Sequence, residues 1–169
     1  MRIDPVTLVL DLGSLKSGSS TETVRLPMHE IDWEIADIVP ASPEGVLEIS
    51  VTARDRTWVC RGTLTVEFET PCARCLEPAL FPVDADVFRV FTQDPELADD
   101  LDTELIPRNE GAVSILDAVR EAVILSVPGM PLCRTDCRGL CAECGANLNS
   151  TGCEHSGSAP DGSDPSERE

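Results

Sequence analysis

The segment from Leu132 to His155 constrains this chain more than any other, because it holds five cysteines and one histidine within 24 residues. A closed tetrahedral zinc site takes four protein ligands, and two such sites take eight. Six ligands overfill one site and underfill two. The segment therefore predicts either idle ligands or two further ligands elsewhere in the sequence.

A Cys-x2-Cys pair outside this segment supplies the two missing ligands. A turn of this kind lets two thiolates reach one ion at about 2.3 Å while the backbone folds around them. The pair raises the total to eight, which is enough for two closed sites. The partition that we favour consists of Cys72, Cys75, Cys133 and Cys137 in a four-thiolate site, and Cys141, Cys144, Cys153 and His155 in a second site.

Two other partitions stay open at this stage. One is a zinc ribbon of Cys72, Cys75, Cys141 and Cys144, with Cys133, Cys137, Cys153 and His155 forming another site or none. The other is a single metal ion. His155 is the weakest of the predicted ligands, because a histidine beside a polar tail is commonly just exposed to solvent.

Cys60 is the one cysteine that this arithmetic leaves out. Residues 57–70 alternate between apolar and polar side chains, which predicts a half-buried strand with Cys60 on the inward face. A free cysteine in that position behaves as a small buried hydrophobe. We therefore expect Cys60 to bind no metal.

The cellular compartment decides whether clustered cysteines bind metal or form disulfides. The first residues contain no long apolar run, so we expect neither a signal peptide nor a membrane span and place the chain in the cytoplasm. Reducing compartments keep thiols free, which favours metal ligation over disulfide or redox chemistry. With every coordination position filled by protein, we expect two structural Zn²⁺ ions and no catalytic metal.

The rest of the sequence predicts an α+β fold, mostly antiparallel sheet with one amphipathic helix. Strands are expected at residues 6–12, 22–26 and 46–54, and again at 57–70 and 79–91 around a cysteine-bearing turn, with a slip in the alternation before Val90. Residues 114–125 predict the helix, capped by Ser114 with Asp117 as its capping-box partner and stopped by Pro128. Its apolar stripe is Ile115, Leu116, Val119, Ala122 and Val123.

The domain organisation follows from the same pattern. We expect a β-rich domain over residues 1–131, a cysteine-rich zinc module over 132–155 packed on it, and a disordered acidic tail over 156–169. The acidic stretch at residues 94–104 is expected to be a solvated loop.

The charge of the chain restricts its partners. With 31 acidic against 13 basic residues, the formal net charge is −18. Two zinc ions bound by seven thiolates would add about three more negative charges. Such a chain is poorly suited to bind phosphates directly, so weak nucleic-acid binding and a basic protein partner are expected, with Arg134 and Arg138 as the only contacts we would assign to RNA.

No enzymatic motif accompanies the cysteines. The sequence has neither a phosphate-binding glycine loop with Lys and Ser/Thr nor a His-Glu-x-x-His pair, and His29 has no evident nucleophilic partner. A dithiol oxidoreductase places its Cys-x2-Cys at the start of a helix, whereas Cys72 and Cys75 lie between predicted strands. We therefore expect a protein that is not an enzyme.

The motifs "CARCLEP", "ILSVPGMPLC" and "DCRGLCAECGANLN", with a closing cysteine, resemble the YceD family of large ribosomal RNA subunit accumulation proteins. The resemblance runs from about residue 60 to 155. It implies a non-enzymatic factor for accumulation, processing or assembly of 23S rRNA, working near pre-large-subunit particles, and it carries over the six motif cysteines from Cys72 to Cys144. Many relatives close with Cys-x-Cys, whereas this chain has Cys153 and His155. A zinc-ribbon transcription adaptor and a thiol redox protein are the alternatives.

Overall fold

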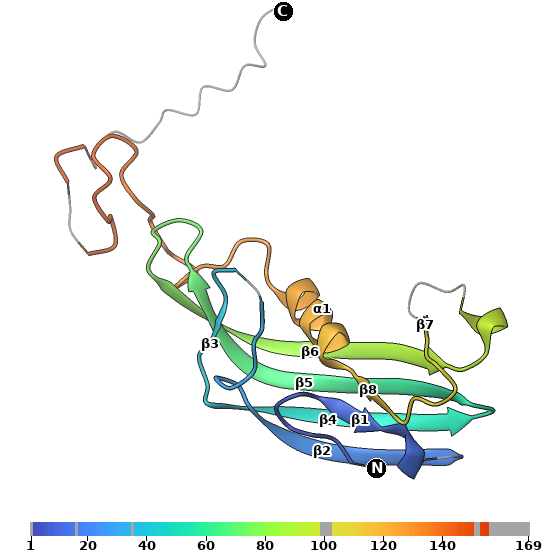
Figure 1. Ribbon diagram of the computed structural model, residues 1–169. Coiled ribbons are helices and arrows are strands. Elements are labelled where there is room, and N and C mark those ends of the chain that lie inside the picture. Colours follow the sequence, from blue (N-terminus) through green and yellow to red (C-terminus); the bar gives the residue numbers. More distant parts are fainter. Residues whose placement is uncertain (1, 16, 35, 99–102, 151–152, 156–169) are drawn as a thin grey trace, which may run out of the picture. The chain divides into compact units, whose positions relative to one another are not determined.

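The computed structural model describes residues 2–15, 17–34, 36–98, 103–150 and 153–155 (Figure 1). The chain divides into two compact units. Unit 1 is Met1–Thr70 with Leu80–Gly129, and unit 2 is Pro71–Ala79 with Met130–Glu169. The turn that carries Cys72 and Cys75 thus belongs to the same unit as the cysteine-rich segment. The expected tail, residues 156–169, lies outside the described residues, and the domain boundary at residue 131 stays a prediction.

Unit 1 is built mainly from β-structure, and one α-helix is present in the described part of the chain. The elements are β1 (Val9–Asp11), the 3₁₀ turn η1 (Leu12–Ser14), β2 (Gly18–Pro27), β3 (Val39–Pro40), β4 (Glu44–Arg54), β5 (Thr57–Pro71), β6 (Pro78–Thr92), η2 (Pro95–Leu97), β7 (Thr103–Leu105), β8 (Ala112–Ser114) and α1 (Leu116–Ser126). The main sheet has the order β2-β4-β5-β6-β7, with β3 paired to β5, and β1 and β8 form a separate antiparallel ribbon.

The predicted fold class is confirmed in its main feature, a largely antiparallel sheet with one α-helix. Strands β2, β4 and β5 pair antiparallel. Cross-strand hydrogen bonds join Thr63 to Asp86 and Thr65 to Asp84, so the numbering of β5 and β6 runs in opposite directions, as a hairpin requires. The exception is β7, which pairs parallel to β6 and makes the sheet mixed.

The alternation of side chains in the long strands places the core on one face of the sheet. In β5 the buried apolar side chains are the predicted ones, Trp58, Cys60, Leu64, Val66 and Phe68. They join one cluster with the buried side chains of α1, among which Val119 and Val123 are inaccessible to solvent. The predicted apolar stripe of the helix is thereby confirmed as a core-packing face.

Burial in β6 alternates through Phe88 and then gives way to half-buried Arg89 and Val90 and to buried Phe91 and Thr92, so the alternation ends where the slip before Val90 is predicted. Arg89 occupies the inward position that looked like a break in the sequence. Its guanidinium donates to the Glu121 carboxylate on α1 at 2.8 Å. An ion pair at the edge of the core therefore fills a position that the hydrophobic pattern alone cannot recognise.

Local boundaries differ from the sequence-based ones in three places. The first strand, expected over residues 6–12, is restricted to β1, because Asp4 accepts hydrogen bonds from Val6 and Thr7 and holds a turn there. β2 begins at Gly18, before the strand expected at residues 22–26. The N-cap of α1 is Ile115, while Ser114 ends β8 and its hydroxyl accepts from the Leu116 N–H at 3.2 Å.

The close pairing of β4 and β5 at Gly62 gives a first testable prediction. A Cβ atom at this position would lie 2.5 Å from the Glu48 carbonyl oxygen. Because that neighbour is backbone, the strands must separate, and we expect Gly62→Ala to lower the free energy of unfolding by about 1–3 kcal/mol. Urea denaturation followed by tryptophan fluorescence measures this. Gly111→Ala, where the added Cβ meets nothing within 4 Å, should change stability much less.

None of the helices in the described part of the chain is long and apolar enough to cross a bilayer.

Candidate metal centres

Two turns in unit 2 have the same backbone hydrogen bonds, although they are far apart in sequence. In the first, the Cys72 N–H donates to the Glu77 carbonyl at 2.8 Å and the Leu76 N–H donates to the Cys72 carbonyl at 3.0 Å. In the second, Cys141 N–H donates to the Ala146 carbonyl at 2.8 Å and Gly145 N–H to the Cys141 carbonyl at 2.9 Å. We call these turns knuckle 1 (residues 72–77) and knuckle 2 (residues 141–146).

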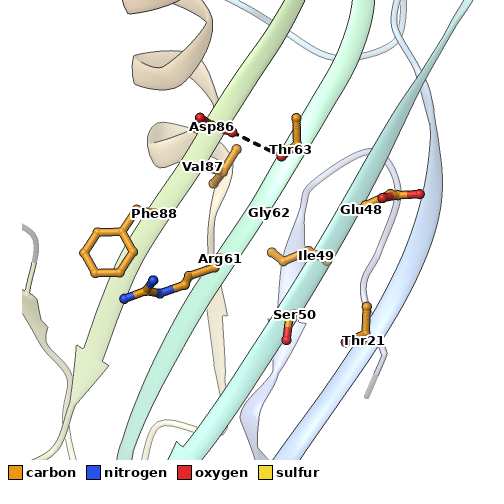
Figure 2. A pocket seen from close by; sticks show the side chains of 10 residues that line it. All are labelled: Thr21, Glu48, Ile49, Ser50, Arg61, Gly62, Thr63, Asp86, Val87 and Phe88. Carbon is orange, nitrogen blue, oxygen red and sulfur yellow. Dashed lines mark hydrogen bonds between the residues drawn. The ribbon is translucent and has the colours of Figure 1, made fainter.

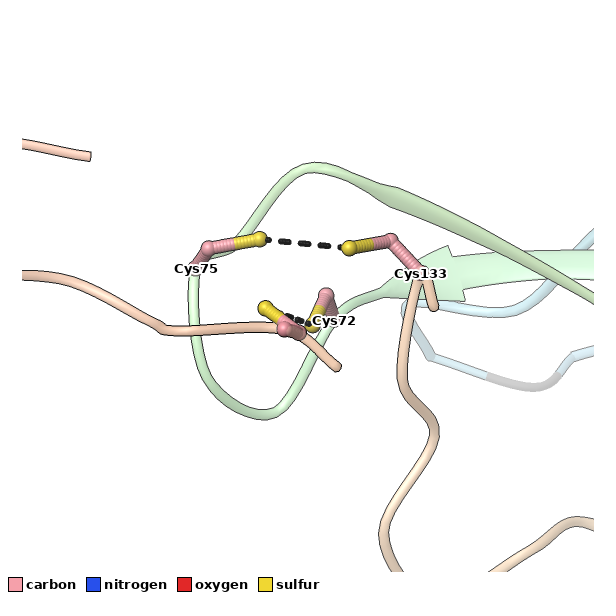
Figure 3. A group of neighbouring side chains, drawn as sticks. Cys72, Cys75 and Cys133 are labelled. Atoms are coloured by element: carbon pink, nitrogen blue, oxygen red, sulfur yellow. Dashed lines mark hydrogen bonds between the residues drawn. The ribbon is translucent and has the colours of Figure 1, made fainter. Parts of the chain in front are cut away.

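Knuckle 1 provides half of the first ligand group. Figure 3 shows Cys75 facing Cys133, with their sulfur atoms 3.6 Å apart. The sulfur atoms of Cys72 and Cys137 are 3.8 Å apart, and all four lie within 4.8 Å of one another. Four sulfurs placed 2.3 Å from one zinc ion in a tetrahedron are about 3.8 Å apart, so the donor set fits this metal.

Hydrogen bonds along the backbone hold the first group in place. Ala73 N–H donates to the Pro131 carbonyl at 2.8 Å, which fixes the chain that leads into Cys133. The Arg74 guanidinium donates to the Cys137 carbonyl at 2.8 Å, and the Leu140 N–H donates to the Arg74 carbonyl at 3.1 Å. Residues from both parts of unit 2 are thus joined at the ligand group itself.

The second group is more open to solvent. It contains the four residues predicted from the sequence, Cys141, Cys144, Cys153 and His155, with ligand atoms within 4.8 Å of one another. Cys144 and His155 are exposed, whereas in the first group Cys72, Cys75 and Cys137 are buried. His155 Nε2 also lies 3.6 Å from the carboxylate of Glu143, inside knuckle 2. The structure brings together the favoured partition, while metal ligation by these residues stays a prediction.

The electrostatics of the two groups favour thiolates at defined positions. Burial raises the pKa of the Cys72 thiol, but backbone N–H groups, led by that of Arg74, outweigh it and lower the pKa to about 6. Backbone N–H groups of Cys144 and Glu143 lower the pKa of Cys141 to about 7. Burial and the neighbouring thiols raise the pKa of Cys133 to about 12. Four thiolates so close together repel one another, and a divalent cation removes that repulsion.

No disulfide is formed by the eight cysteines, all of which lie within the described residues. Cys60 is completely buried in unit 1, and burial raises its pKa to about 12. It therefore remains a neutral thiol and a small core side chain. The prediction that separated Cys60 from the ligand groups is confirmed in its burial.

Asn149 is a supporting residue that the sequence did not reveal. Its side-chain nitrogen donates to the Cys137 sulfur at 3.3 Å. Its side-chain oxygen accepts from the Arg138 N–H and from the Arg134 guanidinium, each at 2.8 Å. Arg134 is also 3.4 Å from the Asp136 carboxylate. Arg134 and the backbone of Arg138 thus support the first group, whereas nothing here tests the RNA contact considered for them.

Removing the Asn149 amide is expected to weaken metal binding at the first group. The outer partners of metal ligands typically contribute 10- to 100-fold in affinity, so Asn149→Ala should lower zinc affinity there by about that factor. Competition with a chromophoric chelator measures the change. Asn109→Ala, at an exposed position in unit 1, is the matched control. Equal chelator resistance in both variants would contradict the supporting role of Asn149.

The open face of the sheet in unit 1 contains a shallow hollow of about 700 Å³ (Figure 2). There the Arg61 guanidinium lies over the Phe88 ring, 5.1 Å from its centre. The Thr63 hydroxyl donates to the Asp86 carboxylate at 3.1 Å. These side chains contact one another across neighbouring strands and do not converge on one point where a ligand could bind. The hollow is therefore a weaker candidate site than the cysteine groups.

The fold and the two ligand groups define a class of β-sheet protein with paired cysteine knuckles. The family model for the large ribosomal RNA subunit accumulation protein YceD matches residues 60–166, and the chain belongs to this family. The match confirms the resemblance recognised in the motifs from "CARCLEP" to "CRGLCAECGANLN".

Curated relatives come from mycobacteria. An uncharacterized protein of Mycobacterium leprae is 30% identical over 136 residues, which is 79% of this chain and 58% of that protein. Uncharacterized proteins of Mycobacterium bovis and Mycobacterium tuberculosis are 31% identical over 107 residues, which is 62% of this chain and 51% of theirs. The chain thus spans between half and three fifths of the length of these relatives. No solved structure matches it.

Proposed function

We propose that each ligand group holds one structural Zn²⁺ ion and that the chain is a non-enzymatic factor in the accumulation of large-subunit ribosomal RNA. The observation that carries the metal assignment is the spacing of the sulfur atoms in the first group, 3.6 and 3.8 Å for the two facing pairs. That spacing is far longer than the 2.05 Å of a disulfide and close to the edge of a zinc tetrathiolate.

The ligand sets support a structural metal and no catalysis. Four protein ligands in each group leave no coordination position for a water molecule or a substrate. When bound, zinc supplies a fixed cross-link between segments and neutralises part of the thiolate charge. Two side chains of unit 2, those of Arg74 and Asn149, donate hydrogen bonds to Cys137. Backbone N–H groups of the two knuckles lower the pKa of Cys72 and of Cys141 and so favour their thiolates.

The biological part of the proposal rests on the family, whose description connects it with large ribosomal RNA subunit accumulation. The net charge of −18 favours action through a basic protein, such as a ribosomal protein or a processing factor, over binding to naked rRNA. Free thiols and zinc ligation both suit the cytoplasm, where ribosomal subunits are assembled. In this proposal the protein holds a basic partner on or near the pre-large-subunit particle.

The test is deletion of the gene in its own organism, followed by measurement of the ratio of 23S to 16S rRNA. We expect the ratio to fall, and the wild-type gene to restore it. The chain should cosediment with pre-large-subunit particles in a density gradient. An unchanged rRNA ratio in the deletion strain would refute the rRNA part of the proposal, and copurification with RNA polymerase instead of pre-ribosomal particles would favour a transcription adaptor.

A further inference from the structure

Leu76 in knuckle 1 has an unusual backbone conformation for its side chain. Its φ angle is +63°, in the left-handed region that favours glycine. Knuckle 2 offers an internal comparison, because its equivalent residue is Gly145, with φ +71° and the same hydrogen bond to the first cysteine of its turn. Both turns thus need a left-handed φ angle at this position, which favours glycine, and knuckle 1 has a leucine there.

The Leu76 side chain does not compensate for this conformation by packing. It is 68% exposed, so it contributes little to a core. A branched apolar side chain in a left-handed position is strained, and such strain clusters at sites that bind other molecules. The exposure and the φ angle together indicate that Leu76 serves a contact outside the described chain.

Other apolar side chains are exposed on segments bonded to the same turn. Met130 is 64% exposed, and its neighbour Pro131 accepts the Ala73 N–H. Leu140 is 37% exposed, and its own N–H donates to the Arg74 carbonyl. Three segments of unit 2 therefore meet at knuckle 1, and each brings one exposed apolar side chain.

The composition of unit 2 favours protein over RNA as the molecule bound there. Residues 71–79 and 130–169 contain no aromatic residue, so they offer no platform on which bases stack. In the described part of unit 2 there are three arginines and no lysine against four acidic residues, and seven thiolates with two zinc ions would add about three negative charges. Two of the arginines, Arg74 and Arg134, already hold Cys137 and Asn149. A negatively charged unit with exposed apolar side chains on segments bonded to one turn fits a basic polypeptide that presents an apolar side chain.

We propose that Leu76, with Met130 and Leu140 beside knuckle 1, is the docking surface for a basic protein segment that carries an apolar side chain between Lys or Arg residues. This inference rests on the proposed function, because it locates the basic partner on the metal-bound unit. Metal binding then serves to present Leu76, since the ligands Cys72 and Cys75 belong to the same turn and the Leu76 N–H donates to the Cys72 carbonyl.

Substitutions at Leu76 separate docking from folding. Glycine and asparagine both accept the left-handed conformation. Leu76→Gly and Leu76→Asn should therefore keep two zinc ions per chain, with a urea midpoint equal to or above that of the wild type. Leu76→Met keeps an apolar side chain of similar size. Leu97→Ala removes another leucine that is half exposed, in unit 1, and is the control.

The binding test uses individually purified large-subunit ribosomal proteins of the source organism, with naked 23S rRNA as a parallel probe, in calorimetric titrations of the zinc-loaded full chain. We expect at least one ribosomal protein to bind the wild type, Leu76→Met and Leu97→Ala alike. Leu76→Gly and Leu76→Asn should bind that protein at least tenfold more weakly.

The results that would contradict the docking surface differ from those that would contradict the proposed function. Binding of Leu76→Gly with wild-type affinity would overturn the docking surface while the partner itself stands. Absence of binding to every ribosomal protein, or Leu76-dependent binding to naked rRNA, would overturn the assigned class of partner. Dissociation of a homodimer by Leu76→Gly, seen by light scattering, would assign the surface to a second copy and refute the proposal. The rRNA ratio in the deletion strain tests the proposed function independently of all three.

Discussion

The Cys137→Ser variant is expected to retain at most one zinc ion per chain instead of two and to lose the fold of unit 2. Cys137 is almost fully buried, lies 3.8 Å from the Cys72 sulfur and accepts the Asn149 amide. Structural zinc typically contributes on the order of 10 kcal/mol or more to the folding of a small domain. Among the described residues of unit 2, the buried cluster around the ligand group adds only Ala79 to Cys72, Cys75 and Cys137.

Native mass spectrometry on protein purified without chelator gives the zinc content, and hydrogen exchange gives the fold. We expect fast exchange of the Ala73 and Leu140 amides in Cys137→Ser. The Cys144→Ser variant should also lose one ion, but it should keep those amides protected, because the second group lies beyond them in the chain. That result would mean that the second group stabilises only the segment that contains its own ligands, whereas the first group joins the two parts of unit 2.

Cys60→Ala is the matched control, because it removes a cysteine that lies in the core of unit 1. It should keep two zinc ions at a modest cost in stability. Loss of zinc from this variant would show that the ligand groups had been wrongly assigned. Two ions retained in Cys137→Ser would remove the first group from the list of metal centres.

Periodicity made much of unit 1 predictable. Apolar and polar residues alternate over most of the long strands, so the inward position of residues such as Trp58, Leu64 and Phe68 could be predicted. The same reasoning did not reveal the partner of Arg89, because an ion pair with Glu121 has no signature in a hydrophobic pattern. It also failed for β7, whose three residues pair parallel to β6 through contacts that no local signal encodes.

Ligand counting made the candidate site predictable for a different reason. Four ligands per zinc is a chemical constraint, and the buried strand position of Cys60 removed the one surplus cysteine. The supporting residues could not be found in this way. Asn149 holds Cys137 from 12 residues further along the chain, and an asparagine in a polar segment resembles any turn residue. The left-handed φ angle of Leu76, which matches that of Gly145 in knuckle 2, is a backbone property that a leucine in the sequence does not indicate.

Alkaline pH is expected to destabilise unit 1 through Cys60. Burial raises the pKa of this thiol to about 12, whereas a cysteine in an unfolded chain titrates near 8.5. Below pH 8.5 the thiol is neutral in both states and the stability from this group is fully present. Between about pH 8.5 and 12 the unfolded chain releases the proton while the folded chain keeps it, so the free energy of unfolding falls as the pH rises.

At pH 10 the expected loss is about 2 kcal/mol, from 1.5 pH units at 1.36 kcal/mol each. Few other side chains titrate in this range, since the sequence has no tyrosine and a single lysine. The seven cysteines among the proposed zinc ligands are shared by the wild type and Cys60→Ala, so their contribution cancels between the two proteins. Trp33 and Trp58, both buried in unit 1, report its unfolding by fluorescence.

The comparison between the two proteins isolates the thiol. Cys60→Ala should be less stable than the wild type at pH 7, because it leaves a small cavity in the core. As the pH rises towards 10 the two unfolding free energies should converge. Only the wild type has the Cys60 thiol, and loss of its proton in the unfolded chain lowers the free energy of unfolding. If the difference between the two unfolding free energies stays constant from pH 7 to 10, the pKa of the Cys60 thiol is the same in the folded and unfolded states and its side chain is accessible to solvent. Convergence would place Cys60 in the core and leave seven cysteines for metal, which is the number that two sites completed by His155 require.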